Sequence, residues 1–191
     1  GAAMTVAAGW PLPLGRLVFH LDPLSAFFLV PVLALSALAA VYGVAYLRHA
    51  PVHKAAAAAG FFNLLVASMI AVLVAGNSVL FLFAWEGMTL ASFFLVVHDD
   101  HESRSREAGW IYLVVAHVGA ACLLAFFVLL GRHNGSLDLL PAARLPEAFP
   151  AGLASALFLL ALAGFGTKAG LVPLHFWLPE AHPAAPSHVS A

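Results

Sequence analysis

The sequence predicts an all-α membrane protein, a polytopic bundle of about five transmembrane helices, and two observations carry this prediction. Of the 191 residues, 63% are hydrophobic and only 9% are charged, whereas a typical soluble domain carries about 25% charged residues. Apolar runs that reach the roughly 20 residues of a helical span also recur along the chain. Too few charges remain to cover a soluble globule, so lipid must solvate much of the surface.

The chain is expected to hold one transmembrane domain preceded by a short segment outside the membrane. Residues 1–20 are predicted to be an extramembrane segment or loop, and residues 21–191 the transmembrane domain. The first span begins at Asp22 and Pro23, a pair typical of a helix start. The apolar runs are rich in Leu, Ala and Phe without polar alternation, so strands are not expected in them. The predicted spans are residues 21–47, 55–75, 78–97, 108–130 and 151–172.

The connections between the predicted spans differ slightly in positive charge. The first and third connections fall on one side of the membrane and carry four basic residues, against three on the opposite side. The four are Arg48, Lys54, Arg104 and Arg106, and the three are Arg16, Arg132 and Arg144. Because cytoplasmic loops are enriched in Lys and Arg, the first and third connections are predicted to face the cytoplasm.

The tail after the fifth span is predicted to be a broken helix, followed by the start of a further helix. Pro173 offers no N–H to the carbonyl of Ala169, and Gly166 and Gly170 weaken the same stretch. The helix is therefore expected to break just past Lys168, with a simple proline kink as the alternative. Broken helices at mid-membrane are a feature of transporters, because the freed backbone groups need water or ions. The tail's prolines are Pro173, Pro179, Pro183 and Pro186.

Two ionisable groups fall inside the predicted spans, where a charge is costly. Glu86 lies eight residues into the third span, which places it about 12 Å deep at 1.5 Å per residue. Lys168 lies deep in the fifth span. Insertion scales put a central charged side chain at about 2.5–3.5 kcal/mol unfavourable. Each group is therefore expected to face the bundle interior, to pair with another group, or to line a water path.

We expect Glu86 and Lys168 to form an intramembrane pair that serves proton transfer. Desolvation favours a neutral amine, whereas a nearby carboxylate favours the ammonium. Lys168 should therefore hold a proton when Glu86 approaches and release one when Glu86 moves away. A buried pair that only fixes helix packing is the alternative, although such a pair is weak evidence for stability.

His117, near the middle of the fourth span, is a candidate proton relay because histidine titrates near neutral pH. A lone histidine hydrogen-bonded to a neighbour is an equally good interpretation. The tail histidines are spaced by seven and six residues and fit no common zinc motif. They are His175, His182 and His188.

Other chemistries are not expected. The single cysteine, Cys122, cannot form an internal disulfide and matches no metal spacing. No phosphate-binding glycine loop, cysteine cluster or Ser/His/Asp arrangement is present. The net charge of −1 excludes a strongly basic nucleic-acid surface. The prediction is no metal, no cofactor, no catalytic residue and no nucleic-acid partner.

Two motifs give the sequence a family resemblance. The stretch from Phe83 to Ser92, FAWEGMTLAS, resembles the glutamate-bearing helix of the antiporter-like subunits of respiratory complex I. The stretch from Lys168 to Pro183, KAGLVPLHFWLPEAHP, resembles their lysine-bearing broken helix. The ending PAAPSHVSA is most similar to the branch found in membrane-bound hydrogenases, which includes the large membrane subunit of formate hydrogenlyase. Subunits of multisubunit sodium/proton antiporters are near relatives.

The resemblance implies a fold of inverted helical repeats, of which this chain would be the truncated first. It matches Glu86 to the family's paired glutamate, Lys168 to its central lysine, and His175 to a position near the break. The starting residues, without a basic n-region, also predict a fragment. The resemblance further implies a multi-pass subunit of the inner (cytoplasmic) membrane, in contact with other membrane subunits and with peripheral hydrogenase or iron–sulfur subunits. Redox chemistry would occur in those partners, so no redox site is expected here.

Several functions remain open at this point. The leading hypothesis is a proton-translocating subunit of a hydrogenase or NADH:quinone oxidoreductase-like complex. A subunit of a multisubunit sodium/proton antiporter is the alternative. A haem-binding electron carrier would need His117 and His175 to face each other from adjacent helices, and a purely architectural subunit would need no titrating lysine.

Overall fold

The computed structural model describes residues 3–9, 17–99, 101–139 and 149–190, and most of them are helical. Five helices are long and apolar enough to cross a membrane, which confirms the predicted helical spans. They are α1 (Pro23–Tyr46, continued by the short 3-10 helix η1, Leu47–His49), α2 (Val52–Val74), α3 (Ser78–Val96), α4 (Ser103–Asn134) and α5 (Ala151–Ala169). Two short helices follow, α6 (Leu178–Ala184) and α7 (Ser187–Ser190).

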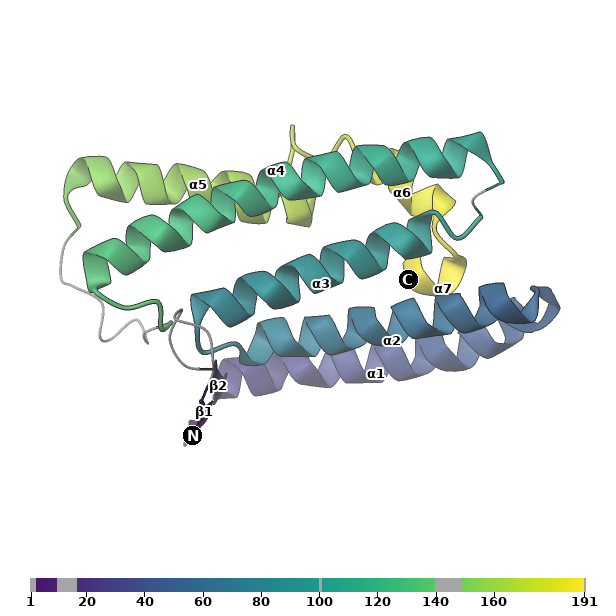
Figure 1. Cartoon of the computed structure of the whole chain (residues 1–191), viewed down its shortest axis with the longest axis horizontal. Coiled ribbons are helices and arrows are strands. Elements are labelled where there is room, and N and C mark those ends of the chain that lie inside the picture. The colour runs from purple at the N-terminus through teal and green to yellow at the C-terminus, as the bar shows by residue number, and fades with distance from the viewer. Residues whose placement is uncertain (1–2, 10–16, 100, 140–148, 191) are drawn as a thin grey trace.

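The long helices run roughly parallel or antiparallel to one another in a bundle (Figure 1). Helix α3 lies between α2 and α4, α1 lies against α2, and α5 lies against α4. Two clusters of buried apolar residues join these helices. One surrounds Tyr112 and Ala181, where α4 meets α6, and the other surrounds Trp85 and Leu123, where α3 meets α4. The bundle thus has its inner contacts along α3 and α4.

A two-stranded antiparallel hairpin precedes the bundle. Strands β1 (Met4–Ala8) and β2 (Leu17–Leu21) pair with Val6 opposite Phe19. The Gly76 N–H donates to the Val18 carbonyl at 2.8 Å, so the hairpin is tied to the connection between α2 and α3. The hairpin was not predicted. Residues 1–20 form a short segment without the regular alternation of polar and apolar residues that distinguishes a strand from a loop. Its placement outside the membrane stays a prediction.

The predicted break past Lys168 is confirmed. Helix α5 ends at Ala169, and Gly170 adopts a left-handed conformation with φ of 69°. The Leu171 N–H donates to the Gly166 carbonyl at 2.9 Å, and Gly170 N–H to the Thr167 carbonyl, which together form a Schellman cap. The fifth helix is therefore three residues shorter than expected, because glycine ends it before Pro173 does.

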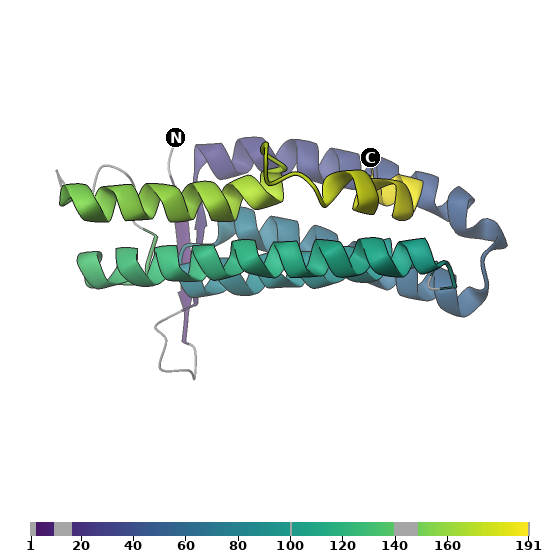
Figure 2. The ribbon, with the colours of Figure 1, turned by 90° about the horizontal axis from the view of Figure 1, so that it is seen from above.

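Helix α4 is longer than its predicted span and supports both halves of the broken helix. Its 32 residues correspond to about 48 Å, since the polar residues at both ends continue the helix beyond the apolar run. Figure 2 shows α5 and then α6 lying one after the other along α4. Both make contact with it, so the break between them lies beside an unbroken helix.

Candidate functional site

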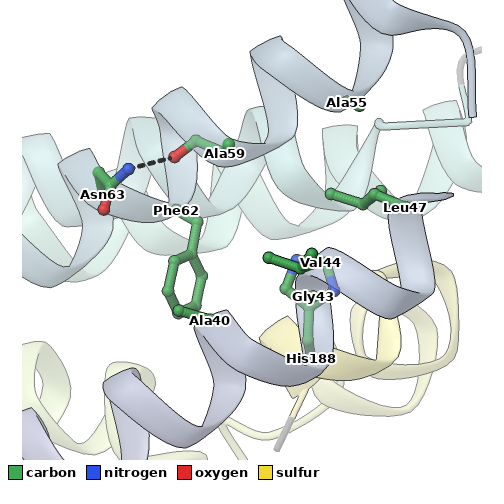
Figure 3. Close-up of a pocket in the computed structure, with 9 residues that line it drawn as sticks. All are labelled: Ala40, Gly43, Val44, Leu47, Ala55, Ala59, Phe62, Asn63 and His188. Atoms are coloured by element: carbon green, nitrogen blue, oxygen red, sulfur yellow. Dashed lines mark hydrogen bonds between the residues drawn. The ribbon is translucent and has the colours of Figure 1, made fainter.

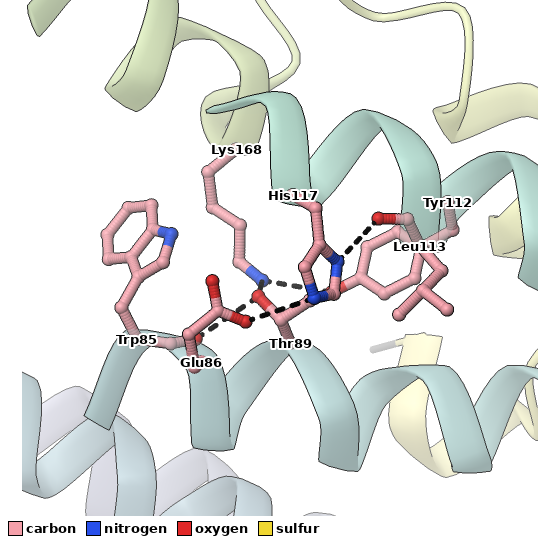
Figure 4. A network of polar contacts seen from close by, with 7 residues as sticks. All are labelled: Trp85, Glu86, Thr89, Tyr112, Leu113, His117 and Lys168. Carbon is pink, nitrogen blue, oxygen red and sulfur yellow. Dashed lines mark hydrogen bonds and ion pairs between the residues drawn. The ribbon is translucent and has the colours of Figure 1, made fainter. Parts of the chain in front are cut away.

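The Lys168 side chain lies in the last turn of α5, directly before the break. A cation is favoured there, because the C-terminal end of a helix carries partial negative charge. Its ammonium donates to the Tyr112 hydroxyl at 2.9 Å and to the Thr89 hydroxyl at 3.4 Å. Lys168 therefore connects α5 with α3 and α4 (Figure 4).

The oxygen atoms that receive the ammonium are themselves buried and oriented. Thr89 is 0% exposed and Tyr112 is 4% exposed. The Thr89 hydroxyl donates its own proton to the Trp85 carbonyl at 3.1 Å, which leaves its lone pairs for Lys168. The ammonium also lies 5.9 Å from the Trp85 ring centroid and 5.4 Å from that of Tyr112, within the range of cation–π attraction.

Glu86, on α3, faces a different partner. Its Oε2 lies 3.6 Å from Nε2 of His117 on α4. Nδ1 of His117 lies 2.8 Å from the Leu113 carbonyl oxygen, and a carbonyl can only accept, so Nδ1 must carry the hydrogen. Nε2 is then the nitrogen that gains or loses a proton, and it is the one that faces the carboxylate. The carboxylate and this nitrogen face each other at a distance slightly longer than a direct hydrogen bond.

The structure brings three of the predicted site residues together and leaves one apart. Figure 4 shows the carboxylate of Glu86, the ammonium of Lys168 and the imidazole of His117 directed into one space between their helices. His175 lies outside this cluster, in the connection between α5 and α6. Its buried Nδ1 has no hydrogen-bond partner among the described residues. Its role in proton transfer stays a prediction.

Glu86 and Lys168, expected as an intramembrane pair, make no direct ion pair with each other among the described residues. The ammonium is bonded to hydroxyl groups of Tyr112 and Thr89, while the carboxylate contacts His117. Helix α4 offers each charged group a different partner, Tyr112 for Lys168 and His117 for Glu86. The two charges therefore belong to one polar cluster without touching.

Sequence reasoning missed Tyr112. The signal that could have found it is a phenolic hydroxyl inside an apolar helix, because a buried Tyr O–H usually finds a partner. The sequence could not predict that Tyr112 faces α5, because α4 is apolar on nearly every side and its pattern does not show which side faces a neighbouring helix. Among the described residues, no group of three or more His, Cys, Asp or Glu side chains is placed to hold a metal.

Residues 75–191 match the transmembrane family described as NADH:quinone oxidoreductase/Mrp antiporter. The chain belongs to this family. The matched residues include α3, α4 and the broken helix, and therefore the whole cluster around Lys168. The resemblance drawn from the two motifs is thereby confirmed.

Individual relatives agree with this family. Hydrogenase-4 component B of Escherichia coli (strain K12) is 44% identical over 193 residues, covering 100% of this chain and 28% of that protein. Formate hydrogenlyase subunit 3 of the same organism is 29% identical over 202 residues, covering 100% of this chain and 31% of that protein. The chain thus spans less than a third of the length of these family members.

A solved structure shows the same fold. The Mrp complex from Dietzia sp. DQ12-45-1b contains a chain that superposes with a TM-score of 0.86 at 28% identity. The match covers 98% of this chain and 20% of that one. This chain is therefore a multi-pass membrane protein with the antiporter-like fold of the family.

Proposed function

We propose that this chain is part of a proton-translocating membrane subunit in a hydrogenase or NADH:quinone oxidoreductase-like complex. The observation that carries the proposal is the cluster in which Lys168, Glu86 and His117 lie together where three of the apolar helices, α3, α4 and α5, meet. Charged groups inside a membrane are expensive and mark ion or proton pathways. Redox chemistry belongs to partner subunits, and this chain contributes proton transfer.

The geometry suggests how a proton is handled. Glu86 and His117 Nε2 lie 3.6 Å apart, so a small approach of the two side chains or one bridging water lets a proton pass between them. Lys168 stores a second proton as the ammonium, which Tyr112 and Thr89 stabilise by accepting hydrogen bonds. Loss of those two acceptors favours the neutral amine and releases the proton, since desolvation penalises the charged form.

We also propose the surroundings of the subunit. The membrane is the inner (cytoplasmic) membrane, and residues 1–20 lie outside it. Other membrane subunits and peripheral hydrogenase or iron–sulfur subunits are the partners. The names of the hydrogenase-4 and formate hydrogenlyase relatives support this assembly.

The test uses the full-length subunit in its purified complex, reconstituted in proteoliposomes. We expect Glu86→Gln and Lys168→Ala to abolish redox-coupled proton uptake, measured with a pH-sensitive dye, while the complex stays assembled. Glu107→Gln and Arg132→Ala, which change exposed charges at opposite ends of α4, are the matched controls and should pump normally. Normal pumping by both cluster variants would overturn the proposal.

A sodium/proton antiporter subunit is a second candidate, and the likeness to the Mrp complex favours it. Proton flux in the same proteoliposomes, measured with and without sodium, separates the two functions. A proton flux that requires sodium and needs no electron donor would support the antiporter.

A further inference from the structure

The side chain of Trp177 bridges the break between α5 and α6. Trp177 is the N-cap residue of α6, and its indole N–H donates to the Thr167 carbonyl of α5 at 2.9 Å. The Gly170 N–H donates to the same oxygen at a longer distance, 3.3 Å. Carbonyls in the last turn of a helix lack their usual partners. The indole therefore binds an acceptor that the break leaves available.

The same indole ring contacts Tyr112, the residue that accepts a hydrogen bond from Lys168. The ring centroids of Trp177 and Tyr112 lie 5.2 Å apart, and the ring planes are tilted by 58°. Aromatic rings attract each other at this separation. Tyr112 belongs to a buried apolar cluster of α4 and α6, and Trp177 packs against that cluster. Trp177 thus restricts the positions that the Tyr112 ring can take.

These contacts form a closed loop of four residues in three parts of the fold. Lys168 follows Thr167 in α5, and its ammonium donates to the Tyr112 hydroxyl on α4 at 2.9 Å (Figure 4). The Tyr112 ring meets the Trp177 ring, whose N–H returns to Thr167. A displacement of α6 against α5 must therefore either break the indole hydrogen bond or disturb Tyr112.

We propose that Trp177 is a positioning residue that holds the Tyr112 hydroxyl against the Lys168 ammonium and thereby couples α6 to the proton stored at Lys168. The proposal rests on the proton transfer proposed above for Lys168. Tryptophan combines a ring N–H donor with a large apolar face, and the structure uses both. Packing of α6 on α4 alone would need the apolar face but not a donor directed at α5.

The test is a double-mutant cycle in the full-length subunit, within its purified complex in proteoliposomes. Trp177→Leu removes both contacts and should slow redox-coupled proton uptake about two- to tenfold, the factor that corresponds to one aromatic pair. In a Tyr112→Phe background, the same change should slow uptake by less than about twofold, because the hydroxyl that Trp177 positions is already missing.

A pH profile gives a second readout that simple packing would not alter. The pH of half-maximal uptake should move in the same direction in Trp177→Leu as in Tyr112→Phe, and no further in the double variant. Trp177→Phe keeps a ring beside Tyr112 and should recover part of the rate. It takes the place of Trp177→Leu in the cycle if the leucine variant does not assemble.

Trp110→Leu is the matched control. Trp110 lies on α4, the same helix as Tyr112, but it is 64% exposed. This variant should pump at the unmodified rate and with the unmodified pH profile. Size-exclusion chromatography checks that every variant complex is assembled.

Two results would overturn the inference while the proposed function stands. Losses that add up in the double variant would show that Trp177 acts through helix packing and not through the Tyr112 hydroxyl. Normal uptake by Trp177→Leu, in a complex whose uptake Lys168→Ala abolishes, would separate Trp177 from the stored proton. Normal uptake by Lys168→Ala would instead overturn the proposed function, and this inference with it.

Discussion

Nδ1 of His117 donates to the Leu113 carbonyl, and this contact determines which imidazole nitrogen faces Glu86. It fixes the exchangeable position of the imidazole at Nε2, the atom 3.6 Å from Glu86. At Lys168, the decisive neighbour is a hydroxyl. Tyr112 accepts the shorter of the two hydrogen bonds that the ammonium donates, so it is the residue that most directly stabilises the stored proton.

Tyr112→Phe is expected to slow proton transfer while leaving the fold intact, because it removes the hydroxyl and keeps the ring. Hydrogen bonds to charged groups contribute about 1.5–3 kcal/mol, so the pumping rate should fall roughly tenfold or more. The measurement is redox-coupled proton uptake in proteoliposomes. Tyr42→Phe, on the exposed face of α1, serves as the control. An unchanged rate in Tyr112→Phe would remove the hydroxyl from the pathway.

Asp22 gives a prediction about pH. The Ser25 N–H donates to its Oδ1 at 2.7 Å and holds the pKa of this carboxyl below its ordinary value. The N-cap therefore stabilises α1 at neutral pH, and that contribution is lost as the pH falls through the lowered pKa. The full-length subunit should unfold at a lower temperature with Asp22→Ala than without it at pH 7, and the difference should shrink at pH 3. Asp22→Asn should show little pH dependence, and a constant difference for Asp22→Ala would contradict the capping role.

The residue types could be predicted from the sequence, but their pairing could not. Glu86 and Lys168 stand out because charges inside apolar runs are costly. That Lys168 bonds to Tyr112 rather than to Glu86 depends on the rotation of α4 about its axis. An apolar stripe normally reveals this rotation, yet α4 is apolar on nearly every side.

At the scale of elements, close approach between α4 and α5 holds Lys168 in reach of its partners. A Cβ on Gly164 would lie 2.5 Å from Cγ of Leu123 and 3.0 Å from the Gly119 carbonyl oxygen. The helices therefore meet backbone to backbone, in the manner of small residues at membrane helix interfaces. This contact places the last turn of α5, with Lys168, against the middle of α4.

Gly164→Val is expected to force α4 and α5 apart and to destabilise the bundle by about 1–3 kcal/mol, the usual cost of overpacking. Gly152→Val is the matched control on the same helix, because nothing lies within 4 Å of a Cβ there. Thermal unfolding of both variants in detergent tests this. Equal unfolding temperatures would show that the interface tolerates the added volume.

The sequence predicted that five long helices are present. It did not predict where the fifth helix ends, nor the hairpin of β1 and β2. Twenty apolar residues without a break are a strong signal, and the glycines and Pro173 correctly indicate the break. The fifth helix ends early because Gly170 forms its cap before the proline is reached. Strands β1 and β2 are five residues each. Strand β2 is hydrogen-bonded to Gly76, in the connection between α2 and α3. A local sequence pattern does not reveal such a contact with a distant segment.

At the scale of the whole molecule, the cluster around Lys168 occupies only one part of the bundle. The cluster lies where α3, α4 and α5 meet, whereas the pocket lined by Gly43, Phe62 and His188 lies between α1, α2 and α7 (Figure 3). Proton-transfer variants such as Lys168→Ala therefore leave the contacts of that pocket unchanged.

Helix α4 carries Tyr112 and His117 only five positions apart, about 7.5 Å along its axis. The same helix thus contacts the ammonium of Lys168 through Tyr112 and the carboxylate of Glu86 through His117. A shift of α4 along its axis by the rise of a single residue, about 1.5 Å, would change both contacts at the same time. Any displacement of α4 along its axis would therefore alter the surroundings of Lys168 and of Glu86 together.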